Sequence, residues 1–404
     1  MFFPDYVTEI LTELRRRGYE AFAVGGCIRD SLLHRTPHDW DAATSALPEE
    51  TQEIFSHAPF GVRVGNGLKH GTVTVYLLAD PHTECEITTF RTEGAYTDHR
   101  RPDSVCFVRH AEEDLARRDF TVNAMAAAPA AQGLEAVFLD PFGGRADLER
   151  GIIRCVGEPR KRFEEDALRI LRGVRFAARY GFTIESETAR AMRECTPLLG
   201  WIAPERIGEE LRGILPGDGC GAQITRFADI IAFLLPGCAA EEAQTLLGRT
   251  DDTDLRLALL LHTCTDSDAR EMLMRYSFGA DTADRTALLI REQNAPLDTH
   301  RARCRLAAAF GKSEAERYLR FRQALDPGEK EPENADALRA LFMPGVCYNT
   351  ATLAVGGREL IRDAGVRPGP AMGEMLAWLM DEVIDGRLPN TAQALLDAVR
   401  RRLL

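Results

Sequence analysis

Strand-like patterns are confined to the first 150 residues of this 404-residue chain. Within that part, alternating or apolar runs predict strands at residues 19–24, 38–42, 72–76 and 84–90. Beyond it, almost every segment repeats its apolar residues at helical spacing. A chain of this length also exceeds what one compact core holds. The sequence therefore predicts an α+β protein, in which a small mixed-sheet head precedes an elongated all-helical remainder.

Turn-forming segments give the expected domain boundaries. The segment 140–144 (DPFGG) ends the head, and segments with Pro and Gly near 216–221 and 326–334 interrupt the helices. We therefore expect a head at residues 1–145, a helical neck at 146–215, a helical body at 216–325 and a helical tail at 326–404. Within the head, helices are expected at 4–17, 27–33 and 112–125, and the polar segment 91–107 is expected to be a loop.

The turn after the first strand carries two glycines, Gly25 and Gly26. A strand that enters a helix through such a turn presents backbone N–H groups and the positive end of the helix dipole, which suit a phosphate group. Downstream, Asp39 and Asp41 are two residues apart, so on a strand both carboxylates point to one face. A carboxylate pair that faces a phosphate-binding turn is what metal-assisted nucleotidyl transfer requires. Taken alone, the same pair also fits a solvated surface loop.

Asp39 and Asp41 are the expected metal ligands and catalytic residues. Mg²⁺ is the expected metal, because it prefers hard oxygen ligands and keeps part of its water shell. Two such ions would activate the attacking hydroxyl group and hold the leaving pyrophosphate. Glu86 shares one face of a predicted strand with Glu84 and Thr88. It is either a third catalytic carboxylate or a solvent-facing strand residue.

The net charge of −12 does not exclude a nucleic-acid partner, because residues 154–193 contain ten Lys and Arg against six Asp and Glu. The ten cysteines are scattered without a C-x-x-C pair, which favours reduced thiols in a cytosol over a zinc knuckle or a disulfide scaffold. No apolar run is long enough to cross a membrane, and the first residues do not form a signal-peptide pattern. A cytoplasmic protein with no membrane partner is expected, and no pattern indicates its oligomeric state.

Five ordered motifs resemble those of the polymerase-beta-like nucleotidyltransferases, in the class II branch of tRNA CCA-adding enzymes and bacterial poly(A) polymerases. They are the segments 24–44 (VGGCIRDSLLHRTPHDWDAAT), 117–124 (RRDFTVNA), 140–144 (DPFGG), 165–176 (EDALRILRGVRF) and 205–211 (ERIGEEL). The tail matches more weakly, around 356–373 and 386–390. The resemblance implies a nucleotidyltransferase head and template-independent addition of C, C and A, from CTP and ATP, to the tRNA 3′ end.

The resemblance also assigns residues to the nucleotide. It implies Gly26 and Arg29 as nucleotide contacts, with Gly25 letting the triphosphate approach the backbone. An ordinary strand-to-helix turn with an exposed arginine is the other interpretation. Arg118 and Asp119 resemble the motif that contacts the sugar and phosphates, and Asp119 could accept a hydrogen bond from the ribose 2′-OH.

Base selection is expected from Asp166 and Arg169, which on one helix would project from the same face. A carboxylate acceptor beside a guanidinium donor can imitate the Watson–Crick edge of a partner base. This pair fits cytosine and adenine, whereas guanine and uracil present the reverse polarity. An ordinary helix salt bridge is the other interpretation. Arg172 and Arg175 extend the stripe, either as a solvated basic face or, by the resemblance, as contacts to the nucleotide or the RNA end.

The choice among related activities is not settled by the motifs. Residues 98–102 (DHRRP) resemble the loop that CCA-adding enzymes need when they switch from C to A, which argues against CC-only activity. An A-adding tRNA nucleotidyltransferase would keep every residue named above. A poly(A) polymerase is mildly disfavoured, because only Arg400–Arg402 form a basic end. A catalytically silent RNA-binding protein is the alternative from another class. In each case the helical tail is expected to bind RNA through backbone and shape.

Overall fold

The computed structural model describes residues 2–65, 71–94, 104–131, 133–326 and 332–403. The chain divides into two compact units. Unit 1 comprises residues 1–236 with 275–277, and unit 2 comprises residues 237–274 with 278–404. The expected division into head, neck, body and tail stays a prediction.

A seven-stranded sheet in the order β3-β4-β5-β2-β1-β8-β9 forms the centre of the head. The pair β2–β5 is parallel, whereas the other neighbouring strands are antiparallel. The mixed sheet predicted from the sequence is therefore confirmed. Its strands are β1 (Ala21–Val24), β2 (Asp41–Thr44), β3 (Phe60–Arg63), β4 (Thr72–Leu77), β5 (Asp80–Thr89), β8 (Ala126–Ala128) and β9 (Val137–Leu139).

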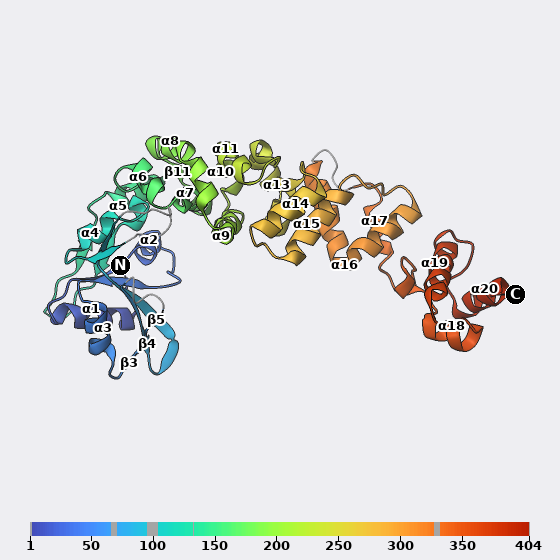
Figure 1. Cartoon of the computed structure of the whole chain (residues 1–404), viewed down its shortest axis with the longest axis horizontal. Coiled ribbons are helices and arrows are strands. Elements are labelled where there is room, and N and C mark those ends of the chain that lie inside the picture. The colour runs from blue at the N-terminus through green and yellow to red at the C-terminus, as the bar shows by residue number, and fades with distance from the viewer. Residues whose placement is uncertain (1, 66–70, 95–103, 132, 327–331, 404) are drawn as a thin grey trace. The chain divides into compact units, whose positions relative to one another are not determined.

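Helices cover the sheet because their apolar residues repeat at helical spacing. In α1 (Asp5–Arg16), the residues Val7, Ile10, Leu11 and Leu14 are buried, and the helix packs on β1. Helix α3 (Pro48–Phe55) packs on β3, β4 and β5, beside which Figure 1 shows it. The helix α2 (Gly26–Leu32) lies against β1. These elements hold the glycine turn and the aspartate strand together.

Two segments of the head differ from the sequence-based expectation. The predicted loop 91–107 begins and ends in a two-stranded hairpin, β6 (Arg91–Glu93) and β7 (Val105–Phe107), because the two ends pair through backbone hydrogen bonds. The predicted loop motif at 98–102 lies outside the described residues. The predicted helix 112–125 is wrong beyond its first turns: α4 spans Ala111–Ala116, and a 3₁₀ turn follows at Thr121–Asn123. After the helix end, the Asp119 carboxylate accepts the Phe120 N–H at 2.8 Å, a local hydrogen bond that competes with helical pairing.

The rest of unit 1 is helical except for a short parallel strand pair. Helix α7 packs against α9 and α10, and its apolar stripe is buried over most of its length. The strand pair is β10 (Ile152–Ile153) with β11 (Thr183–Ile184). The helices are α5 (Gly144–Arg150), α6 (Pro159–Glu165), α7 (Leu168–Tyr180), α8 (Ser186–Glu194), α9 (Pro204–Ile214), α10 (Cys220–Arg226) and α11 (Ala228–Leu234), with a 3₁₀ segment at Thr196–Trp201.

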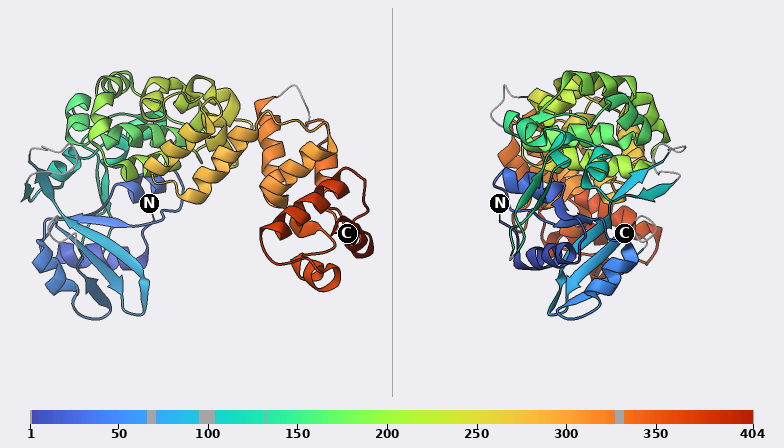
Figure 2. Two further views of the ribbon diagram at one scale, coloured as in Figure 1. Left: turned by 45° about the vertical axis from the view of Figure 1, so that its right-hand side comes forward. Right: turned by 90° about the vertical axis from the view of Figure 1, so that its left-hand side faces the viewer.

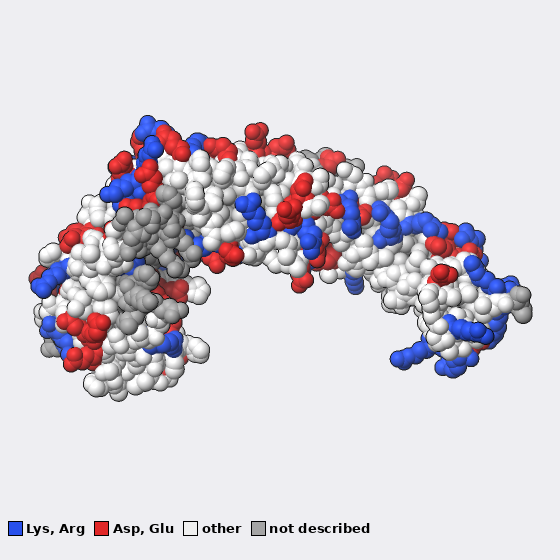
Figure 3. Space-filling view, in the orientation of Figure 1, with Lys and Arg blue, Asp and Glu red and all other residues white. Residues whose placement is uncertain are grey.

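The described residues of unit 2 form helices joined by loops and contain no strand, as the yellow-to-red part of the drawn chain shows in Figure 2. Its last three helices share an apolar core that includes Leu360, Leu379, Leu395 and Val399. Arginine side chains, drawn blue, gather over these helices in Figure 3. The helices are α12 (Ala243–Leu247), α13 (Thr253–Leu261), α14 (Asp266–Arg275), α15 (Ala280–Glu292), α16 (His300–Leu325), α17 (Ala335–Ala340), α18 (Gly357–Ala364), α19 (Pro370–Ile384) and α20 (Ala392–Leu403), with 3₁₀ turns at Ala240–Glu242 and Thr350–Thr352.

Candidate active site

The glycine turn brings a guanidinium group against the backbone. Gly25 has φ 74°, a conformation that side chains rarely adopt, and its N–H donates to the carbonyl of Met125. A Cβ atom at this position would lie 2.8 Å from Nη1 of Arg118. The absence of a side chain at Gly25 therefore admits Arg118 to the turn. Gly26, the first residue of α2, follows directly.

Asp39 and Asp41 flank the buried Trp40 at the start of β2. Trp40 is 7% exposed and packs near Phe3, whereas both aspartates reach solvent. Strand β2 begins only at Asp41, so the prediction that Asp39 lies on the strand is wrong. The alternation of exposed and buried residues nevertheless holds across the three positions. The Asp39 carboxylate lies 3.8 Å from Nδ1 of the exposed His38.

Glu86 is the register partner of Asp41. The parallel pairing of β2 with β5 sets these two residues side by side, and both are exposed. Partial removal from water raises the pKa of Asp41, the charge of Glu86 raises it further, and Arg118 opposes the rise. The carboxylates of Asp41 and Glu86 and the guanidinium of Arg118 thus interact at the edge of the glycine turn.

This donor set suits a hard divalent cation. Carboxylate oxygens at neighbouring register positions can share a cation that keeps several waters. The charge repulsion between Asp41 and Glu86, which raises the pKa of Asp41, would be relieved by such a cation. The described residues contain no closed cluster of three or more His, Cys, Asp or Glu side chains with metal-binding geometry. The carboxylates therefore fit an open, partly hydrated ion better than a protein-enclosed one.

Arg29 lies in the interior instead of on the surface of the turn. Its Nε donates to Asp30 Oδ1 at 2.9 Å and its Nη1 to Asn123 Oδ1 at 2.5 Å. The guanidinium stacks over the rings of Phe176 and Tyr180, with centroid distances of 5.1 and 4.9 Å. Its Nη2 remains beside the turn, 3.5 Å from where a Cβ of Gly26 would stand. Arg29 thus connects the glycine turn to α7.

Asp119 is buried and fully hydrogen-bonded within the protein. Oδ2 accepts from Nε and Nη2 of Arg172 at 2.8 and 2.7 Å, and Oδ1 accepts from Asn123 Nδ2 at 3.0 Å. Burial acts to raise the pKa of Asp119, but Arg172 and the Asn123 hydrogen bond outweigh it and lower the pKa to about 2. The structure therefore joins Asp119 to Arg172, and the expected contact of Asp119 with the ribose 2′-OH stays a prediction.

Asp166 lies in a break between two helices, so the prediction that it shares a helix face with Arg169 is wrong. Helix α6 ends at Glu165, and Asp166 is extended at φ −141° and ψ 103°. Its Oδ1 accepts the Leu168 N–H at 3.1 Å, which starts α7. Its Oδ2 accepts from Nη2 of Arg206 at 3.1 Å. Asp166 is thus paired with an arginine on α9 instead of with Arg169, its partner in the sequence-based hypothesis.

Arg169 is buried and has partners other than Asp166. Nη1 donates to Glu165 Oε2 at 2.9 Å and to the carbonyl of Arg162 at 3.2 Å. Nη2 donates to the carbonyl of Arg117 at 3.1 Å. The alternative interpretation, an ordinary helix salt bridge between Asp166 and Arg169, is therefore wrong, because each side chain has other partners. Further along α7, Arg175 pairs through Nε with Glu210 of α9 at 2.8 Å.

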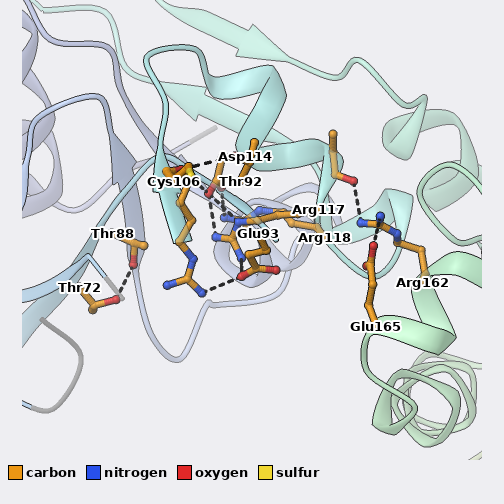
Figure 4. A network of polar contacts seen from close by, with 12 residues as sticks. Thr72, Thr88, Thr92, Glu93, Cys106, Asp114, Arg117, Arg118, Arg162 and Glu165 are labelled. Atoms are coloured by element: carbon orange, nitrogen blue, oxygen red, sulfur yellow. Dashed lines mark hydrogen bonds and ion pairs between the residues drawn. The ribbon is translucent and has the colours of Figure 1, made fainter. Parts of the chain in front are cut away.

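A network beneath the site was not foreseen from the sequence. Asp114 is 1% exposed and accepts hydrogen bonds from Arg117 and Arg118, and Arg117 also pairs with Glu93 of the hairpin, as Figure 4 shows. Burial acts to raise the pKa of Asp114, but the two arginines outweigh it and lower the pKa. The acidic run at 112–114 resembles an exposed helix face. The signal for the network was that Arg117 and Arg118 follow Asp114 by three and four residues, the spacing of neighbours on a helix. Asn123, Arg206 and Glu210 were likewise missed as partners, although each lies in a motif.

Models of three protein domains match successive parts of the chain. The poly A polymerase head domain matches residues 21–154, which hold the sheet and the carboxylates. A model described as "Probable RNA and SrmB- binding site of polymerase A" matches residues 181–238. The second domain of tRNA nucleotidyltransferases matches residues 250–399.

Curated relatives match the chain over nearly its whole length. A CCA-adding enzyme of Limosilactobacillus reuteri is 36% identical over 396 residues, which cover 96% of this chain and 94% of the relative. A CCA-adding enzyme of Streptococcus pyogenes is 37% identical over 407 residues, which cover 98% and 96%.

Solved structures share the fold. The Bacillus stearothermophilus CCA-adding enzyme in complex with CTP matches with a TM-score of 0.76 and 31% identity, over 99% of this chain and 98% of that one. The Thermotoga maritima CCA-adding enzyme, solved in complex with tRNA, matches with a TM-score of 0.70 over 99% and 95%, and its 23% identity supports the fold alone.

The fold and the carboxylates at its glycine turn define a nucleotidyltransferase with a poly A polymerase head. The resemblance seen in the five sequence motifs is confirmed at full length. The chain belongs to the family of CCA-adding enzymes, the tRNA nucleotidyltransferases of the CCA end. No described helix is both long and apolar enough to cross a membrane.

Proposed function

We propose that this chain adds C, C and then A, from CTP and ATP, to the 3′ end of tRNA in an Mg²⁺-dependent reaction. The observation that supports this most is the parallel register of Asp41 with Glu86 beside Arg118 and the glycine turn. The similarity to CCA-adding enzymes, 36% identity over 96% of this chain, supports the choice of substrates. The ten free cysteines suit a reducing compartment, so we place the activity in the cytoplasm.

In each step the RNA 3′-hydroxyl oxygen forms a bond to the α-phosphorus, and the bond from that phosphorus to the pyrophosphate oxygen breaks. The hydroxyl proton leaves to solvent or to a carboxylate, and pyrophosphate is released. Asp39 and Asp41 would hold Mg²⁺, with Glu86 beside Asp41 as a further catalytic carboxylate; when bound, the ion would supply activation of the hydroxyl and neutralisation of the leaving group. Gly25 and Gly26 leave room for the triphosphate, and Arg118 supplies charge-assisted hydrogen bonds to it.

Specificity is assigned to side chains of the α6–α7 break and α7. Asp166 would accept from the exocyclic amine of cytosine or adenine, and Arg169 would donate to the ring nitrogen. Arg29, Arg172 and Arg175 are held by acidic, amide and aromatic partners, which supports a role in shaping the nucleotide pocket.

The helices α18–α20 are proposed to bind the tRNA. Exposed cations on these helices and on the segment between α18 and α19 could contact phosphate groups, and Figure 3 shows blue arginine side chains gathered there. Those cations are Arg358, Arg362, Arg367, Arg400, Arg401 and Arg402.

The test supplies tRNA that ends before the first C, after one C or after CC, with labelled CTP or ATP and Mg²⁺. Incorporation of C on the first two substrates and of A on the third alone supports the proposal, and chelation of Mg²⁺ with EDTA should abolish each step. Incorporation of A on the tRNA that ends in CC, with no incorporation of C on any substrate, would indicate an A-adding enzyme. Long A tracts on unrelated RNA would indicate a poly(A) polymerase, and no incorporation would indicate a silent RNA-binding protein.

A further inference from the structure

We propose that Arg206 positions the Asp166 carboxylate and thereby sets how well the enzyme distinguishes cytosine from uracil and adenine from guanine. This inference rests on the proposed role of Asp166 in reading the base. Arg206 itself need not touch the nucleotide, so it is a positioning residue.

The Asp166 carboxylate is oriented by two donors from different elements. The Leu168 N–H holds Oδ1, and Nη2 of Arg206 holds Oδ2, each at 3.1 Å. An ionised carboxylate offers about four acceptor positions, so two remain for an exocyclic amine of a base. The backbone donor fixes one oxygen only. The hydrogen bond from Arg206 to the second oxygen therefore prevents the carboxylate group from rotating about its Cβ–Cγ bond.

The helix that carries Arg206 is itself held firmly against α7. A Cβ at Gly213 of α9 would lie 2.5 Å from Cδ of Arg175, so the two helices approach closely there. Glu210, four residues after Arg206, pairs with Arg175 at 2.8 Å. Arg206 and Glu210 thus form two ion pairs from one face of α9, to Asp166 and to α7. The helix that carries Arg206 is therefore held in place by its contacts with α7.

The ion pair of Arg206 and Asp166 is largely removed from solvent. The side chains of Arg206 and Asp166 are 25% and 17% exposed, so their attraction is screened less than that of a surface pair. The other terminal nitrogen of Arg206, Nη1, is buried and has no hydrogen-bond partner among the described residues. Among the described residues, Asp166 is thus the hydrogen-bond acceptor found for the Arg206 guanidinium, which also interacts electrostatically with Glu210.

The experiment measures kcat and KM for single additions to tRNA lacking CCA, with CTP against UTP, and to tRNA ending in CC, with ATP against GTP. Arg206→Met removes the donor while keeping an unbranched side chain. We expect the C-over-U and A-over-G ratios of kcat/KM to fall about tenfold, mostly through KM for the correct nucleotide. Arg206→Lys keeps one charged donor and should recover the ratios to within about threefold of the unsubstituted enzyme.

The matched control is Arg212→Met, an arginine on the same helix that donates to the carbonyl of Ser277 and lies away from Asp166. Its ratios should not change. Asp166→Ala should lower the ratios about 100-fold, and adding Arg206→Met to it should change them no further, since the two residues act as one unit. Thermal unfolding confirms that each variant folds. If Arg206→Met does not fold, Arg206→Gln is measured instead, with the same direction of change.

Two outcomes would overturn the inference in distinguishable ways. If Asp166→Ala loses discrimination but Arg206→Met lowers kcat/KM equally for right and wrong nucleotides, Arg206 has only a structural role and the base-reading proposal stands. If Asp166→Ala keeps its discrimination, the base-reading role of Asp166 fails, and the role of Arg206 fails with it.

Discussion

Asp41 and Glu86 are direct neighbours in the parallel pairing of β2 with β5, far apart in sequence but side by side on an exposed face of the sheet. The sheet, and not a local sequence motif, makes this carboxylate pair. The sequence allowed two interpretations of Glu86, a catalytic carboxylate or a solvent-facing residue. The pairing places Glu86 beside Asp41, the second aspartate of the predicted metal-binding pair.

Replacing Glu86 by Gln should lower kcat for C addition about 100-fold, because one charge that stabilises the reacting phosphate and its cation is lost. The change is isosteric, so the thermal unfolding temperature should stay the same. Glu84→Gln is the matched control: this residue lies on the same strand face but pairs with Arg63 at 3.0 Å. Equal rates for Glu86→Gln and Glu84→Gln would refute a catalytic role for Glu86.

Gly25→Ala should destabilise the protein by about 1–3 kcal/mol and weaken nucleotide binding. The new Cβ would meet Nη1 of Arg118 at 2.8 Å as well as adopt φ 74°. Gly18→Ala is the control, since Gly18 has φ 92° with no atom within 4 Å of the added Cβ. Equilibrium unfolding and KM for CTP separate the two effects: both variants lose stability, but only Gly25→Ala should raise KM.

Arg29→Ala should cost about 2–4 kcal/mol of unfolding free energy, because it leaves Asp30 and Asn123 without their buried donor and removes stacking on Tyr180. Arg35 also lies over the Tyr180 ring, at 5.0 Å, but is exposed. Arg35→Ala should cost below about 1 kcal/mol. Urea unfolding of both variants makes the comparison, and equal losses would show that the buried hydrogen bonds of Arg29 contribute nothing.

The Asp119–Arg172 pair predicts a loss of stability in acid. The folded-state pKa of Asp119 is about 2, below the ordinary 3.8, so its contribution is fully present above about pH 5 and disappears as the pH falls through 2. The contribution at neutral pH is about 2 kcal/mol. Unfolding followed from pH 6 to 2 should show this decline, and Asp119→Asn should be less stable at pH 6 with a flatter profile. An unchanged profile in Asp119→Asn would contradict the assignment.

Much of the head could be predicted because its signals are local. The apolar run before Gly25 and the alternation around Trp40 require only the strand period, and the buried face of α1 requires only the helical one. The family itself followed from five ordered motifs. These are properties of neighbouring residues, which a sequence displays directly.

The arrangement around Asp166 could not be predicted in the same way. Apolar spacing continues through the α6–α7 break, so periodicity does not reveal that Asp166 leaves the helix to accept the Leu168 N–H. Its partner Arg206 comes from another helix, and Arg117 pairs with Glu93 of the hairpin, which lies 24 residues earlier in the chain. Such long-range pairings depend on tertiary packing, which the spacing of residues in the sequence does not reveal.

The measurement that tests the central claim most directly is the single-turnover rate of C addition by Asp41→Asn, with tRNA lacking CCA, saturating CTP and Mg²⁺. If the carboxylates at the β2–β5 register perform the reaction, the rate should fall more than about 1000-fold, while CTP and tRNA still bind and the protein stays folded. A rate close to that of the unsubstituted enzyme would contradict the account.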